Sequence, residues 1–102
     1  MNGSHLIPEQ FKLNHKTIKV IVDDDYCVSE ECVGEADFTQ KLITLASVCN
    51  GKKITKAEKE KTFFHELVHM ILDSMGRYRL KYDEKFVDEF ALKLHEYEKS
   101  KI

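Results

Sequence analysis

The first half of the chain alternates hydrophobic and polar residues over short runs, a pattern typical of β-strands. The clearest run is TIKVIV at residues 17–22, which is rich in β-branched side chains and precedes an acidic turn at residues 23–25. Two further runs, at residues 34–38 and 41–47, are separated only by Thr39-Gln40, which indicates a hairpin. With an extra strand at residues 11–14, the pattern predicts a small antiparallel sheet of three to four strands.

The second half has the spacing of hydrophobic positions that is typical of amphipathic helices. Asn50-Gly51 interrupts the chain, and the run TKAE at residues 55–58 is a capping box, so we expect a helix from Lys56 to about Ser74. Gly76 is expected to end this helix. Its apolar face predicts burial against the sheet. The residues of that face are Phe63, Phe64, Leu67, Val68, Ile71, Leu72 and Met75.

The run HELVH at residues 65–69 of this helix matches the H-E-x-x-H signature of a zinc-activated water. Residues four apart lie about 40° apart on one helical face and about 6 Å apart along the axis, so His65 and His69 can reach one metal ion. Glu66 falls on the same side, where it is expected to hold the water and take its proton. Two such histidines can also form a packed, hydrogen-bonded pair. Glu66 between them, the capped helix and the carboxylates downstream favour the metal site.

A second helix is expected from Asp83 to Lys99, and it should supply the third protein ligand that a catalytic zinc ion takes. Glu84 lies at the edge of its apolar face, and Asp88 follows one turn later, where it can orient a ligand histidine. We therefore favour Glu84 as the ligand, with Glu89 as its rival. Tyr78 and Tyr82, in the connection between the helices, are candidates for donating to a developing oxyanion or for lining the rim.

The two helical segments resemble a known family. Residues 62–72 (TFFHELVHMIL), followed by residues 83–88 (DEKFVD), look like the small H-E-x-x-H proteins of phages and mobile elements, which are minimal gluzincins similar to ImmA/IrrE-type metallo-endopeptidases. The resemblance covers about residues 18–95. It implies a phage- or prophage-encoded hydrolase with zinc held by His65, His69 and Glu84 and with Glu66 as general base. Val68 is a departure, because longer relatives often have Gly just before the second His.

Charge and cysteine content limit the partners and the compartment. Sixteen basic and eighteen acidic residues give a net charge of −2, so we expect no nucleic-acid partner. No run approaches about eighteen consecutive apolar residues, and no signal peptide is recognisable, so we expect no membrane partner and a cytoplasmic location in a bacterial host cell. Cys27, Cys32 and Cys49 are odd in number, which predicts reduced thiols rather than a disulfide framework.

A chain of 102 residues allows one domain. We expect an N-terminal tail over residues 1–10, whose first five residues resemble in part an expression scar, and a single zincin-like domain over residues 11–102. The predicted fold is α+β, with a three- to four-stranded antiparallel sheet packed on the H-E-x-x-H helix and a second C-terminal helix.

The function that we predict is zinc-dependent hydrolysis of a peptide or protein substrate, which would add as a strand along residues 42–47. The alternative is a non-catalytic phage accessory or host-interaction protein in which the zinc ion is structural or vestigial.

Overall fold

The computed structural model describes residues 4–101, which form the α+β fold that the hydrophobic pattern predicts. A four-stranded sheet consists of β1 (Gln10–Leu13), β2 (Lys16–Val22), β3 (Gly34–Asp37) and β4 (Leu42–Leu45). A separate hairpin consists of β5 (Val48–Cys49) and β6 (Lys52–Lys53). The helices are α1 (Asp24–Ser29), α2 (Lys56–Ser74), α3 (Tyr78–Lys81) and α4 (Glu84–Ser100).

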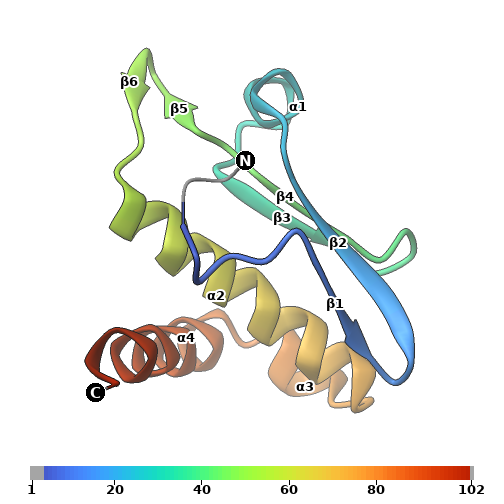
Figure 1. Ribbon diagram of the computed structural model, residues 1–102. Helices are drawn as coiled ribbons and strands as arrows, with labels where there is room; N and C mark the ends of the chain where they lie inside the picture. The colour runs from blue at the N-terminus through green and yellow to red at the C-terminus, as the bar shows by residue number, and fades with distance from the viewer. Residues whose placement is uncertain (1–3, 102) are drawn as a thin grey trace.

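The sheet is mixed rather than purely antiparallel, because its strands are ordered β1-β2-β4-β3. The hairpins β1–β2 and β3–β4 are antiparallel, as expected, but β2 pairs in parallel with β4, with Val20 opposite Ile43. After α1 the chain first forms the edge strand β3 and then returns as β4 between β3 and β2 (Figure 1). The most apolar strand therefore has a central position, where Ile43 and Leu45 are fully buried, whereas the polar strand β3 forms an edge.

The short elements that were not predicted are α1, α3 and the β5–β6 hairpin, and local chemistry explains the first and the last. The acidic turn expected at residues 23–25 is the start of α1, where Asp23 Oδ1 accepts a hydrogen bond from the backbone N–H of Tyr26 at 3.0 Å. Carboxylates at this position satisfy unpaired N–H groups and interact favourably with the helix dipole. Asn50 and Gly51 have φ angles of 51° and 78°, the positive values that a two-residue hairpin turn between β5 and β6 requires.

α2 has the bounds that its sequence predicts, because it is capped at both ends. The Thr55 hydroxyl accepts a hydrogen bond from the backbone N–H of Glu58 at 3.1 Å, and the Glu58 carboxylate accepts one from that hydroxyl at 2.9 Å. After the last turn, Gly76 has a φ of 70°, and two backbone N–H groups return to the helix in a Schellman motif. The two caps determine where α2 begins and ends, so the H-E-x-x-H segment lies within its regular helical turns.

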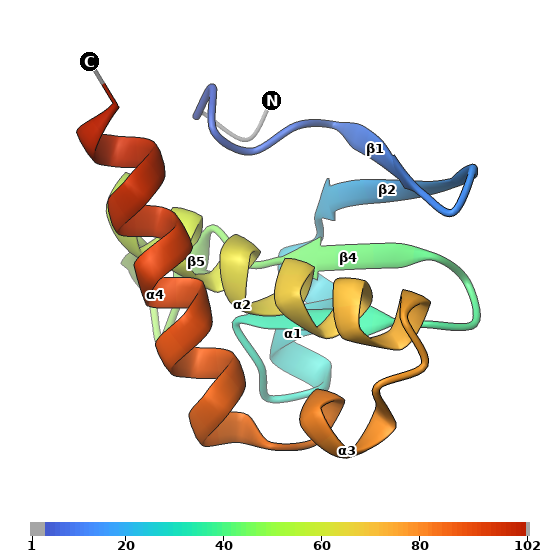
Figure 2. The same cartoon turned by 90° about the horizontal axis from the view of Figure 1, so that it is seen from below.

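The hydrophobic core lies on both sides of α2, which is placed between the sheet and α4 (Figures 1 and 2). Full burial of one large apolar side chain stabilises a protein by about 1.5–3 kcal/mol relative to its exposure. Both neighbours of α2 therefore hold it in place. The most deeply buried apolar side chains of the core are Phe63 and Met70 of α2, Ile43 and Leu45 of β4, and Val87 of α4.

The segment before β1 belongs to the fold and is not a separate tail. Ile7 is 3% exposed and lies in the hydrophobic core, and the Ser4 hydroxyl donates a hydrogen bond to the buried carboxylate of Glu60 on α2. Burial of these side chains moves the boundary that we expected after residue 10 toward the N-terminus. Residues 1–3, which include most of the expected expression scar, lie outside the described residues.

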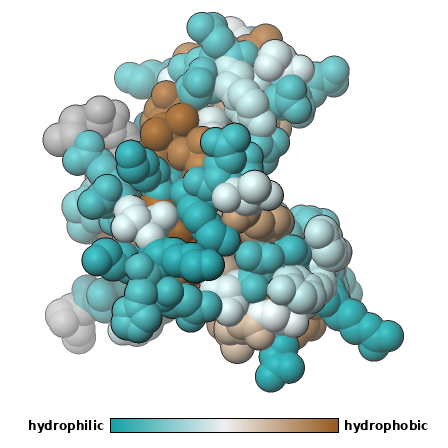
Figure 3. All heavy atoms as spheres, turned by 90° about the vertical axis from the view of Figure 1, so that its right-hand side faces the viewer, coloured by the Kyte–Doolittle hydropathy of each residue, from teal (hydrophilic) through white to brown (hydrophobic). Residues whose placement is uncertain are grey.

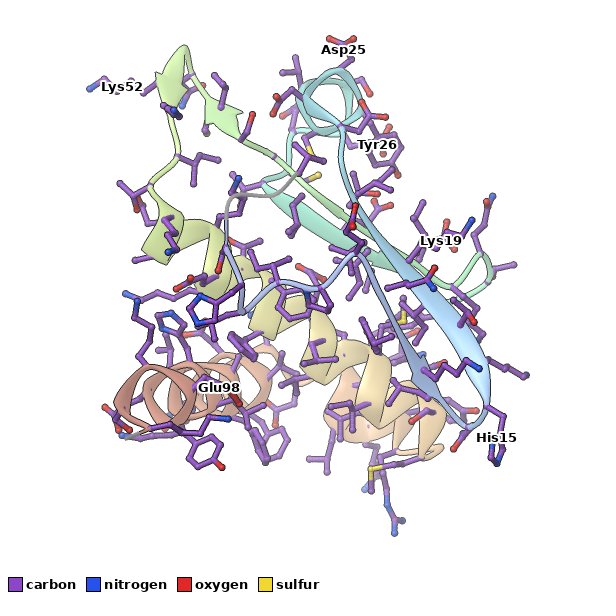
Figure 4. The ribbon with its side chains drawn as sticks, in the orientation of Figure 1. His15, Lys19, Asp25, Tyr26, Lys52 and Glu98 are labelled. Carbon is purple, nitrogen blue, oxygen red and sulfur yellow. The ribbon has the colours of Figure 1, made fainter. Side chains whose placement is uncertain are left out.

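The sheet face that is turned away from α2 is largely polar. Lys19 extends outward from β2 (Figure 4), and Figure 3 shows a mainly hydrophilic surface on this side of the molecule, with hydrophobic atoms in small interrupted patches. Ile21, which is 39% exposed, contributes apolar area on this face of β2. None of the helices in the described part of the chain has the length and apolarity needed to cross a bilayer.

Candidate metal centre

His65 and His69 of α2 and Glu84 of α4 converge on one point. Nε2 of His65 lies 3.0 Å from Oε1 of Glu84 and 3.2 Å from Nε2 of His69, which in turn lies 3.3 Å from Oε2 of Glu84. Ligand atoms bound at about 2.0–2.1 Å around a tetrahedral ion are about 3.3–3.4 Å apart, so these separations fit one small cation. The structure thus brings together the three side chains that the sequence analysis selected, and they can hold a metal ion.

Glu84 reaches the histidines because α4 begins beside them. Asp83 Oδ1 accepts a hydrogen bond from the backbone N–H of Phe86 at 3.1 Å and starts the helix at Glu84. Val87, one turn later and 0% exposed, packs α4 against the core, which leaves Glu84 at the edge of the buried face. The rival Glu89 is exposed and is not a member of the metal-holding group.

The second ring nitrogen of each histidine also has a partner. Nδ1 of His65 lies 3.6 Å from Oδ1 of Asp88, the residue that we expected to orient a ligand. Burial lowers the pKa of His69, while Glu84 and a hydrogen bond with the Lys81 backbone act in the opposite direction. A backbone group that raises the pKa of an imidazole is an accepting carbonyl, so the carbonyl of Lys81 is the group that favours a proton on the His69 ring.

The tautomer that suits a metal site carries its proton on the outer nitrogen of each ring, near these partners. A neutral imidazole with its proton on Nδ1 presents a lone pair at Nε2. The Nε2 atoms of His65 and His69 face each other at 3.2 Å and also face the carboxylate of Glu84. Such a group of electron pairs is repulsive unless a cation or additional protons lie among them, and partners on the outer nitrogens are usual for metal-binding histidines. The geometry therefore favours a metal ligand set over a packed histidine pair.

Glu66 lies on the side of α2 that faces β3, and only 9% of the residue is exposed. Burial raises its pKa to about 7; His65 opposes this shift, while Glu84 and Glu35 add to it. A carboxyl group that titrates near neutral pH can both accept a proton and return it. The environment of Glu66 therefore suits proton transfer.

Gly34 is a site residue that sequence reasoning missed. A Cβ atom at Gly34 would lie 2.4 Å from the Cγ2 methyl of Thr62 and 3.5 Å from both Cγ and Oε2 of Glu66. Glycine therefore permits β3 to lie directly against the part of α2 that carries Glu66. No motif in the sequence marks this position, because the contact depends on which strand forms the edge beside α2.

Tyr78 and Tyr82 flank the ammonium group of Lys81. Lys81 Nζ lies 4.8 Å from the ring centroid of each tyrosine and 4.1 Å from that of Phe38, and it forms an ion pair with Asp73 at 2.9 Å. The two tyrosines are 58% and 71% exposed, which fits the rim position among the roles that we considered for them. The ion pair with Asp73 thus holds Lys81 in place between the aromatic rings.

No protein-family model, curated protein or solved structure matches this chain. The resemblance to ImmA/IrrE-type proteins therefore remains a prediction.

Proposed function

We propose that this protein is a zinc-dependent peptide hydrolase with His65, His69 and Glu84 as metal ligands. Two imidazoles and one carboxylate are the protein ligands of many catalytic zinc sites, whereas structural zinc sites usually have four protein ligands. The side chains of Glu84 and His65 are 66% and 24% exposed, so solvent has access to this group. The observation that carries the proposal is this solvent-accessible set of three ligands beside the buried Glu66.

Bound zinc would polarise the scissile carbonyl and lower the pKa of a water molecule. Glu66 is the residue that we assign to accept the proton of that water and to deliver it to the leaving amine. Asp88 and the Lys81 carbonyl would hold the two imidazoles in their orientations. Each of these roles agrees with the burial and the contacts of the residue concerned.

An extended peptide is the substrate form that best fits this site. The binding strand that we expected at residues 42–47 does not suit this purpose, because β4 is already paired with β2 on one side and β3 on the other. β3 is an edge of the sheet, and it contacts α2 at Gly34, next to Glu66. A peptide that pairs with β3 would use main-chain hydrogen bonds and would not require a deep pocket.

The test compares Glu66→Gln with the unmodified protein after both have been loaded with zinc. We expect both proteins to bind one zinc ion per chain and to have the same circular dichroism spectrum. Cleavage of a randomised peptide library, measured by mass spectrometry, should fall by about 10²- to 10⁴-fold, the usual effect of losing a general base. Glu89→Gln, which changes an exposed residue of α4, is the matched control and should cleave at the original rate.

The metal ligands need a separate measurement. His65→Ala and His69→Ala should each lose stoichiometric zinc binding, as measured by elemental analysis after dialysis. Full zinc occupancy in either variant, or undiminished cleavage by Glu66→Gln, would contradict the proposal. Stoichiometric zinc binding without cleavage by the unmodified protein would instead support the non-catalytic alternative.

A further inference from the structure

Cys27 and Cys32 lie at the C-terminal cap of α1. The backbone N–H of Cys32 donates to the carbonyl of Cys27 at 3.0 Å, and that of Glu31 donates to the carbonyl of Val28 at 3.2 Å. Together with the φ of 53° at Glu31, these two bonds define a Schellman motif. In this motif, side-chain contact is common between the third residue from the helix end and the second residue after the cap. At the end of α1, these two positions are occupied by Cys27 and Cys32.

The two thiols differ in their access to solvent. Cys27 is 2% exposed, whereas Cys32 is partly exposed. Burial raises the pKa of Cys27 to about 12, and the contact with Cys32 and nearby acidic groups adds to this effect. Cys32 is therefore the thiol that a soluble oxidant reaches first, with Cys27 placed behind it as its partner.

We propose that Cys27 and Cys32 form a reversible intramolecular disulfide, so that the cap of α1 is a site of modification by a small disulfide such as oxidised glutathione. The Cys32 thiolate attacks one sulfur of oxidised glutathione, whose S–S bond breaks and releases one glutathione thiolate. Cys27 then loses its proton to solvent and attacks the Cys32 sulfur, which releases the second glutathione. Two electrons pass from the protein thiols to oxidised glutathione, which becomes two molecules of reduced glutathione.

The short spacing of the two cysteines favours a disulfide that can be formed and reduced again. The two cysteines enclose a short loop, and a short loop gains less stability from cross-linking than a long one does. The cap also leads directly into β3, since Val33 accepts a hydrogen bond from the backbone N–H of Ala46 at 2.9 Å and Gly34 begins the strand. Oxidation would therefore fix the segment that enters the edge strand.

The neighbouring Tyr26 ties α1 to the same strand. Its hydroxyl donates a hydrogen bond to the carboxylate of Glu35 on β3, and Figure 4 shows Tyr26 on the short helix at the end of β2. The cap is thus held against the sheet at a second point, which keeps Cys27 and Cys32 in their present arrangement in the reduced protein.

The experiment uses the full chain with Cys49→Ser, which removes the exposed thiol of β5. The protein is equilibrated with reduced and oxidised glutathione at a series of ratios, quenched with acid, alkylated and analysed by mass spectrometry. We expect a monomer that is lighter by two hydrogen atoms, with a peptide map that links Cys27 to Cys32, and full reversal by dithiothreitol. The bond should form at a ratio about 10-fold less oxidising in the folded protein than in urea, because the cap raises the effective concentration of the thiols.

Two further variants identify the order of attack. With Cys27→Ala in the same background, the reaction should stop at a mixed disulfide between Cys32 and glutathione, whereas Cys32→Ser should leave Cys27 unmodified. Circular dichroism checks that both variants are folded. A stable mixed disulfide on Cys32 when Cys27 is present would overturn the proposal. Free alkylation of both cysteines at the most oxidising ratio, or bond formation equally easy in urea, would overturn it as well.

Discussion

One helical turn separates two carboxylates of α4 that contact the same histidine at opposite nitrogens. Glu84 Oε1 lies 3.0 Å from Nε2 of His65, whereas Asp88 Oδ1 lies 3.6 Å from Nδ1 of the same ring. The first contact places an electron pair at the point where a cation would lie, and the second determines how the ring is turned. Loss of Glu84 therefore removes a ligand, while loss of Asp88 leaves the ligand set complete but less well oriented.

This difference predicts an order of zinc affinities. Glu84→Ala should weaken zinc binding most, Asp88→Ala should weaken it by about 10- to 100-fold, and Glu89→Ala should leave it unchanged. Competition with a chromophoric chelator measures all three affinities under one set of conditions. If Glu89→Ala showed the largest loss, the third ligand would be assigned to the wrong residue.

The sequence was sufficient to select His65, His69 and Glu84, because helical geometry fixes which residues share a face and both helices have caps that can be recognised. It was not sufficient for Gly34 or for the carbonyl of Lys81. The contact of Gly34 depends on which strand forms the edge of the sheet. The role of Lys81 depends on the short helix α3, which the pattern did not predict.

At the scale of elements, the approach of β3 to α2 depends on one missing side chain. The tight position of Gly34 against Thr62 holds the edge strand near Glu66. A methyl group at Gly34 must displace either the Thr62 methyl or the strand, and overpacking of a close contact typically costs about 1–3 kcal/mol.

Gly34→Ala should therefore lower the free energy of unfolding by about 1–3 kcal/mol, as measured by urea denaturation. Thr62→Ser removes the Cγ2 methyl and keeps the hydroxyl, which donates to the carbonyl of Glu58 at 3.1 Å. The double variant should recover much of the lost stability, while Thr62→Ser alone is the control. Strictly additive effects would show that these two groups do not limit the packing.

The bounds of α2 could be predicted, whereas the order of the strands could not. A helix end is specified by adjacent residues, such as Thr55 and Gly76, and these signals are visible in the sequence. The parallel pairing of β2 with β4 depends on the path that the chain takes through α1 and β3. Strand patterns specify which residues are buried but not which strands are neighbours.

At the scale of the whole molecule, a buried, hydrogen-bonded carboxylate joins three distant parts of the chain. Glu60 of α2 is 0% exposed; its carboxylate accepts a hydrogen bond from Ser4, and its Oε1 lies 2.9 Å from Nε2 of His95 on α4. Burial raises the pKa of Glu60, but the hydrogen bonds from Ser4 and His95 and the charge of Lys99 together outweigh this effect, so its pKa is lowered. Removing this carboxylate leaves its buried hydrogen-bonding partners without compensation.

Glu60→Ala should therefore cost about 3–5 kcal/mol of stability at about pH 7, measured by urea denaturation, because two hydrogen bonds to a charged carboxylate are lost. Because the pKa of Glu60 is lowered on folding, its stabilising contribution is fully present above the ordinary value of 4.5 and is lost as the pH falls through the lower folded value. The stability difference between the unmodified protein and Glu60→Gln should shrink over that acidic range. Glu89→Gln, at an exposed position, should show no such trend, and a constant difference for Glu60→Gln would exclude this titration.

The placement of the three metal-holding residues on two helices couples ion binding to helix docking. His65 and His69 belong to α2 and Glu84 to α4, so a complete ligand set exists only while the two helices are packed together. Thermodynamic reciprocity then requires that an ion strengthens this docking by the same factor by which docking strengthens the ion's affinity. Ala91 is 2% exposed within the core on α4. A bulkier residue there would weaken the packing of α4 against α2 and so reduce ion affinity without contacting the ion. The ion affinity therefore depends on the stability of the whole interface between the two helices.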